Sequence, residues 1–236
     1  MRPPTDLEAL LRVFVIEEAA SVLRHKLRNK LGTIRNAAYY LRRKVQGSPL
    51  WEDVRIPEFF DLIGGELDAA EKALRSQLSP PPCESEHASV CDVSTIAADL
   101  LAASAAPAGI RKLPPVAPAP VWVQAEQREL ALALHCLIEN ALDALTDAGG
   151  GVIEIRCAPG ADVCAVEVID DGPPVTTEAI AKWLEPLYTT RPGRAGMGLK
   201  IAHRIAHRAG GTLELRVGSE RGVRAVLVLG TAHSAR

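Results

Sequence analysis

Several features that mark particular classes of protein are scarce in this 236-residue chain. Aromatic residues make up only 4% of it, and no apolar run approaches the ~20 residues of a membrane-spanning helix. Charges are nearly balanced, with 27 Lys and Arg against 29 Asp and Glu, so the basic surface of a nucleic-acid binder is missing. The N-terminus carries charges where a secretory signal would be apolar. We therefore expect a cytoplasmic protein with no membrane span and no nucleic-acid partner.

Cysteine is also sparse, and the spacing of the five cysteines does not suggest pairs. The thiols are odd in number and fit neither a CxxC motif nor the spacing of a Cys/His metal site. This pattern excludes a disulfide framework and predicts reduced thiols. The five residues are Cys83, Cys91, Cys136, Cys157 and Cys164.

A hydrophobic content of 47% is enough for one or two compact domains. The proline-rich segment at residues 79–82 breaks any helix and divides the chain. We predict a first domain at 1–80, a linker at 81–90 and a second domain at 91–236. A second Pro/Ala-rich stretch, 106–120, is expected to be a loop inside the second domain.

The first domain is predicted to be an antiparallel helical hairpin. Apolar residues recur three or four apart from Val13 to Val45, which is typical of one long amphipathic helix. A second helix follows Pro57, with a bend expected at Gly64 and Gly65. Two helices cannot cover each other's apolar stripes, so we expect a homodimeric four-helix bundle. The alternative is a hairpin packed only on its own C-terminal domain.

His25 lies outside the apolar stripe of the first helix. It is two residues from both Leu23 and Leu27, hence about 200° of helix rotation from each. Asn29, four residues on, shares its outward face. Spacing alone makes His25 no more than a surface histidine.

The second domain alternates helical and strand patterns. Helices are predicted at 126–145 and 197–209, and strands at 121–123, 152–157, 163–169, 212–217 and 223–229. This order predicts a two-layer α/β sandwich with a mixed sheet. The glycines at 193–198 free a loop in front of a helix whose first backbone amides can bind an anion.

The segment 24–31, with residues 34–38, resembles the phosphoacceptor box of dimeric sensor histidine kinases. Four further segments resemble, in order, the N box, the Asp-x-Gly-x-Gly box, the F box and the Gly-x-Gly-Leu-Gly-Leu box of the ATP-binding domain of these kinases. They are residues 137–145, 170–175, 183–191 and 192–202. The resemblance extends from about residue 11 to residue 230, and it implies ATP and Mg²⁺ as cofactors and the receiver domain of a response regulator as partner.

The resemblance also implies roles for individual residues. His25 is the phosphoacceptor, and Asn29 orients a water during dephosphorylation of the partner. Asn140 offers a carbonyl oxygen to Mg²⁺, a hard ligand for a hard cation, and Asp170 accepts a hydrogen bond from the adenine amino group. The remaining nucleotide contacts are Gly172, Thr190, Gly196, Met197, Gly198 and Leu199.

Four positions depart from the family pattern. Lys26 replaces an acid that accepts the second imidazole proton, and an ammonium group cannot do so. Lys30 replaces a proline, Cys136 replaces a second asparagine or a glutamate base, and Pro174 replaces a glycine. Autophosphorylation of His25 is therefore expected to be weak or to use a base from elsewhere. The alternatives are a phosphatase-biased protein and a catalytically silent dimeric scaffold, with input from a separate sensor protein or through the bundle.

Overall fold

The computed structural model describes residues 5–77, 89–117, 120–183, 196–218 and 221–232. The chain forms two compact units. The helical unit contains residues 16–83, and the sheet unit contains residues 84–236 together with the first 15 residues.

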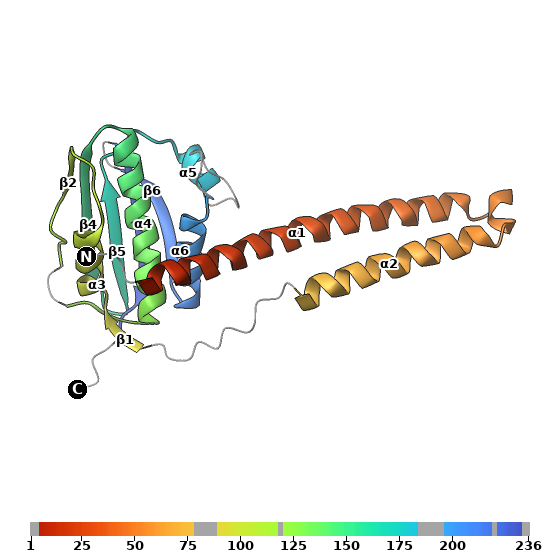
Figure 1. Ribbon diagram of the computed structural model, residues 1–236, viewed down its shortest axis with the longest axis horizontal. Helices are drawn as coiled ribbons and strands as arrows, with labels where there is room; N and C mark the ends of the chain where they lie inside the picture. Colours follow the sequence, from red (N-terminus) through yellow and green to blue (C-terminus); the bar gives the residue numbers. More distant parts are fainter. Residues whose placement is uncertain (1–4, 78–88, 118–119, 184–195, 219–220, 233–236) are drawn as a thin grey trace. The chain divides into compact units, whose positions relative to one another are not determined.

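The helical unit is a hairpin of two helices. Helix α1 (Thr5–Val45) is followed by a short 3-10 helix, η1 (Pro49–Glu52), and by α2 (Arg55–Gln77), which runs back alongside α1 (Figure 1). Gly47, with φ +86°, adopts the left-handed conformation that ends α1. Helix α2 continues through Gly64 and Gly65, where a bend was expected.

Ion pairs connect the two helices of the hairpin. Arg35 of α1 contacts Asp68 at 2.9 Å and Glu71 at 3.2 Å, both on α2. Arg42 contacts Asp61 at 2.8 Å. Exposed pairs of this kind add little stability but favour one register of the helices over others.

The sheet unit contains a five-stranded mixed sheet and a small two-stranded one. The large sheet has the strand order β2-β4-β5-β7-β6, in which only β2 and β4 are parallel among the described pairs. In the small sheet, β1 and β3 are antiparallel. The bounds are β1 Ser89–Asp92, β2 Ile110–Lys112, β3 Trp122–Ala125, β4 Gly151–Pro159, β5 Val163–Asp170, β6 Thr212–Val217 and β7 Val223–Gly230.

Strand β2 lies in the stretch 106–120 that was predicted to be a loop. It has three residues, which are too few to show a period-two pattern. Its partner defines it, since Ile110 pairs with Gly151 and Lys112 with Ile153. Strand β1 likewise begins at Ser89, inside the predicted linker.

Helices α3 (Val93–Ala103), α4 (Gln127–Asp147) and α6 (Gly198–Arg208) lie on one face of the sheet, and a short helix, α5 (Thr177–Trp183), follows β5 (Figure 1). Helix α4 is the centre of the core. Its fully buried side chains include Leu134, Ile138 and Leu145, and the sheet contributes Ile153 and Ile155. The predicted two-layer α/β sandwich is confirmed.

The start of α1 belongs to the core of the sheet unit. Leu7 and Phe14 are 6% and 3% exposed and pack in that core. The guanidinium groups of Arg204 and Arg208 each lie 5.7 Å from the centre of the Phe14 ring. Cation–π contacts and apolar burial together fix these first turns of α1.

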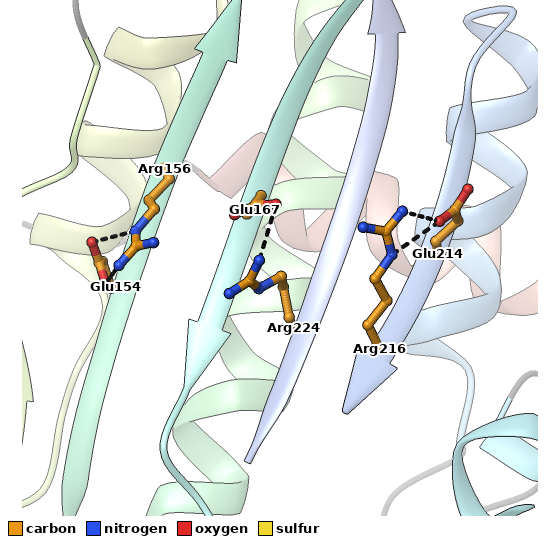
Figure 2. A network of polar contacts seen from close by, with 6 residues as sticks. All are labelled: Glu154, Arg156, Glu167, Glu214, Arg216 and Arg224. Atoms are coloured by element: carbon orange, nitrogen blue, oxygen red, sulfur yellow. Dashed lines mark hydrogen bonds and ion pairs between the residues drawn. The ribbon is translucent and has the colours of Figure 1, made fainter. Parts of the chain in front are cut away.

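The opposite face of the large sheet is charged. Figure 2 shows this face, with the helices behind the strands. Its pairs are Glu154–Arg156 at 2.7 Å, Glu167–Arg224 at 3.7 Å and Glu214–Arg216 at 2.6 Å. The strands thus alternate buried apolar and outward polar side chains, as is typical of a sheet with one solvated face.

Among the helices in the described ranges, none combines the length and apolar character that a bilayer crossing requires.

Both ends of α3 are held by side chains from other elements. At its start, Asp92 accepts a hydrogen bond from the backbone N–H of Ser94 at 3.0 Å. At its end, the ammonium group of Lys112 on β2 donates to the carbonyl oxygens of Leu101, Ala102 and Ser104, at 2.9, 3.2 and 2.9 Å. A cation at this end also favours the helix dipole.

Replacing Lys112 with methionine is expected to lower the free energy of unfolding by about 1–3 kcal/mol, because three carbonyl groups lose a charged donor. Urea denaturation of the full chain measures this change. Arg111→Met, on the exposed neighbouring residue of β2, is the matched control and should change stability by about 0.5 kcal/mol or less. Equal losses for the two variants would contradict the capping role.

Candidate functional site

One face of α4 joins the segments that the sequence singled out. Cys136, Asn140 and Ala144 are four residues apart, so they lie one above another on the helix. A Cβ atom built on Gly198, at the start of α6, would lie 3.7 Å from the Cβ of Cys136. A Cβ built on Gly172, after β5, would lie 3.5 Å from the Cβ of Ala144. Asn140 therefore lies between the two points at which the backbone of other segments comes close to α4, at Gly198 and at Gly172.

The turn after β5 contains two acids in different environments. Asp170 is 5% exposed, and it is the one buried polar or charged side chain among the described residues. Its Oδ1 accepts hydrogen bonds from the backbone N–H groups of Gly172 at 2.9 Å and Val223 at 3.3 Å. Asp171 is exposed, and its Oδ1 accepts from Val152 N–H at 2.6 Å. Asp171 thus fixes the start of β4, whereas Asp170 is a buried carboxylate in a prearranged position.

The turn between β6 and β7 packs against the turn that contains Asp170 and Gly172. Gly222 has φ +73°, and a Cβ there would overlap the carbonyl oxygen of Asp170. Arg221 donates from Nε to the carbonyl oxygen of Gly172 at 3.0 Å. Sequence analysis missed Arg221, because no local motif marks it and its partner is 49 residues away.

The start of α6 offers backbone donors. Gly196 adopts a left-handed conformation with φ +64°, and Met197 is buried. Helix α6 begins at Gly198 and Leu199, and the first N–H groups of a helix have no acceptor within it. This end suits an anionic group such as a phosphate. Thr190 and residues 192–195 of the predicted Gly-x-Gly-Leu-Gly-Leu box, together with most of the predicted F box, lie outside the described residues.

Cys136 packs as an apolar residue. Burial, and after it the negative charge of Glu139, raises the pKa of its thiol to about 12. The neutral thiol is therefore the only form present at physiological pH, and it is no ligand for Mg²⁺. Its role is to fill the space between α4 and Gly198.

We expect Cys136 to resist alkylation by iodoacetamide in the native protein at pH 8, because the thiolate is the reactive form and forms only near pH 12. Mass spectrometry of peptides from native and urea-unfolded samples measures the modification. The unfolded sample is the control, in which the thiol regains an ordinary pKa and reacts. Rapid labelling of the native protein would contradict this packing.

The predicted phosphoacceptor region lies on α1, in the helical unit. His25 and Asn29 are both exposed, on the shared face that their spacing predicted. The Nδ2 atom of Asn29 lies 3.4 Å from Nδ1 of His25. Lys26 is also exposed.

Comparison with known proteins gives the class of the sheet unit. Residues 125–233 match the family described as histidine kinase-, DNA gyrase B- and HSP90-like ATPases. They include Asn140, the Asp170–Gly172 turn and the start of α6. These residues form an ATP-binding domain of that family.

The relatives identify the type of domain more closely. The C4-dicarboxylate transport sensor protein DctB of Rhizobium meliloti is 34% identical over 82 residues, 35% of this chain and 13% of that protein. Sporulation kinase E of Bacillus subtilis is 25% identical over 231 residues, 92% of this chain and 29% of that protein. The chain thus spans less than a third of the length of either relative.

A solved structure supports the fold. The mycobacterial sensor histidine kinase MprB is 18% identical, with a TM-score of 0.53 over 61% of this chain and 98% of that chain. The family match and the relatives in sequence thus identify residues 125–233 as an ATP-binding domain similar to those of sensor kinases.

Proposed function

We propose that this protein is a cytoplasmic histidine kinase. It binds ATP with Mg²⁺, phosphorylates His25, and passes the phosphoryl group to an aspartate of a response-regulator receiver domain. One observation carries the proposal: a single face of α4 presents Asn140 between the buried Asp170 turn and the start of α6. The family match over residues 125–233 and the exposed His25 support it.

Each end of this α4 face suits one end of ATP. Asp170 is buried and acceptor-only when ionised, so it can accept a hydrogen bond from the adenine amino group. The lack of a side chain on Gly172 allows the base to approach the backbone. We assign the amides at Gly196, Met197, Gly198 and Leu199 to the phosphates, because backbone N–H groups at the start of a helix bind anions, and Thr190 is assigned to the same end by resemblance alone.

Asn140 is the proposed protein ligand of Mg²⁺. The described residues contain no group of three His, Cys, Asp or Glu side chains arranged for a metal. This fits Mg²⁺, which is usually held by one or two protein oxygens together with substrate phosphates and waters. A Mg²⁺ ion held by Asn140 would neutralise negative charge that develops on the phosphates.

Phosphoryl transfer requires a lone pair on Nε2 of His25. That nitrogen attacks the γ-phosphorus in line, the bond to the β,γ-bridging oxygen breaks, and ADP leaves with the electron pair. The ring proton on Nδ1 then passes to a base or to water. In the second step a carboxylate oxygen of the receiver attacks the phosphorus, and the P–N bond breaks.

The contact between Asn29 and His25 bears on the first step through the tautomer of the ring. With the NH₂ group of Asn29 toward Nδ1, the proton of a neutral ring lies on Nε2; with the amide oxygen toward Nδ1, the proton lies on Nδ1 and Nε2 keeps its lone pair. Lys26 offers no acceptor for that proton. The second candidate is a phosphatase-biased protein in which Asn29, exposed on α1, orients a water. The third candidate is a silent nucleotide-binding scaffold.

The exposed face of α1 supports a homodimer. Along the helix, apolar side chains repeat every seven residues, the spacing that pairs helices side by side. They remain exposed in the hairpin, so a second copy of the hairpin is the occupant we propose. Three of them are Leu27, Ile34 and Leu41, with 38, 51 and 55% exposure. Such a bundle also offers a route for input from a separate sensor protein.

Asp170→Asn should weaken ATP binding on the order of 10- to 100-fold, because the new amide donor faces the adenine amino donor. Titration calorimetry with a non-hydrolysable ATP analogue and Mg²⁺ measures the affinity. Asp171→Asn is the matched control, since its Oδ1 can still accept from Val152 and its affinity should stay within about 3-fold. Equal losses in both variants would refute the adenine assignment.

Lys26→Glu should increase the rate of autophosphorylation by about 10-fold or more, because a carboxylate can accept the Nδ1 proton of His25. Labelled ATP and the acid-labile phosphoprotein that it produces measure this rate. Lys30→Glu makes the same charge change at another exposed position of α1 and should leave the rate near that of the wild type. His25→Gln should abolish the label.

Two outcomes would contradict this account. Label retained by His25→Gln would rule out His25 as the acceptor. An equal response to Lys26→Glu and Lys30→Glu would show that charge on α1, rather than a proton acceptor beside His25, controls the rate.

A further inference from the structure

The end of the β6–β7 hairpin packs against the Asp170 turn. Gly218 N–H donates to the carbonyl oxygen of Gly222 at 3.0 Å, which closes the hairpin. The next residue, Val223, donates its N–H to Oδ1 of Asp170 at 3.3 Å. The carboxylate is thus oriented by a strand that follows it by more than fifty residues.

The contact is made by backbone and leaves no space for adjustment. A Cβ on Gly222 would overlap both the carbonyl oxygen and the carbon of Asp170, and its φ of +73° disfavours other residues. The hairpin and the Asp170 turn are therefore fixed relative to each other at this point.

Arg221 adds a long-range hydrogen bond to the same turn. Gly172 N–H donates to Asp170 Oδ1 at 2.9 Å, and the Gly172 carbonyl accepts from Arg221 Nε at 3.0 Å. Both polar groups of Gly172 are thus engaged, one by the acid and one by the hairpin. Pro173 follows and has no N–H of its own to stabilise the turn.

We propose that Arg221 is a positioning residue for base recognition: it holds the 170–172 turn so that the Asp170 carboxylate meets the 6-amino group of adenine. The inference rests on the proposed ATP site and deepens it. Arg221 acts through the turn, so its effect depends on the group at position 6 of the purine. A purine with a carbonyl oxygen at position 6 has no donor for the Asp170 carboxylate, so its affinity does not depend on how that carboxylate is oriented.

The test compares ATP with inosine triphosphate, which has that carbonyl oxygen and the same triphosphate. In the wild type, calorimetry should show tighter binding of ATP. Arg221→Ala should weaken ATP binding by roughly 2- to 10-fold and change inosine triphosphate binding by less, so that the preference falls. Arg221→Lys should restore part of the preference, because an ammonium group can donate to the same carbonyl.

Arg216→Ala is the matched control, since Arg216 lies on the same hairpin but pairs with Glu214 on the charged face. It should leave the preference unchanged. Amide hydrogen exchange without nucleotide is a second measurement, in which Gly172 N–H should exchange faster in Arg221→Ala than in the wild type.

An unchanged preference, or equal weakening of both nucleotides with unaltered exchange at Gly172, would overturn the role of Arg221 while leaving the ATP site intact. Failure of the wild type to bind ATP would instead overturn the proposed function, and this inference with it.

Discussion

The close approach of two glycines to one face of α4 sets the dimensions of the candidate site. Gly198 lies against Cys136 and Gly172 against Ala144, and the contacts are near van der Waals distance for a Cβ that neither glycine has. Two turns of helix separate these contacts, with Asn140 halfway between them. A Cβ at either glycine would be in ordinary van der Waals contact with α4, so both segments lie close to the helix. The Asp170 turn and the start of α6 are thus held beside the same face of α4.

This constraint explains how Cys136 is accommodated. A carboxylate or amide there would bring a polar group into a place where the thiol is buried and its pKa is raised to about 12. The thiol instead packs as an apolar group on the side of α4 that faces Gly198. The departure from the family pattern removes a potential metal ligand or base, but it preserves the packing that places α6. The substitution at position 136 can therefore affect the chemical step while leaving the arrangement of the proposed nucleotide site unchanged.

Local patterns predicted the elements that bury a periodic face. The helix predicted at 126–145 is observed at Gln127–Asp147, and the strand predicted at 212–217 is β6. Strand β2 was missed, because it is defined by its pairing with β4 and its three residues are too few to show an alternation of apolar and polar side chains. In the site, the motif segments at Asn140, Asp170 and Gly198 converge on α4, although the assigned roles of these residues remain predictions. Arg221 was unpredictable, since nothing near it in sequence indicates that Gly172 is its acceptor.

The proposed reaction places two different physical demands on the chain. In that proposal, base recognition uses a buried carboxylate that accepts hydrogen bonds from two backbone N–H groups, so it depends on fixed geometry. The proposed acceptor lies among exposed side chains on α1, namely His25, Lys26 and Asn29. Protonation and tautomer there depend on which neighbour faces the ring, so one substitution beside His25 changes its reactivity without altering the nucleotide site. In the proposed reaction, a substitution at Lys26 therefore acts on the transfer step and leaves nucleotide binding unchanged.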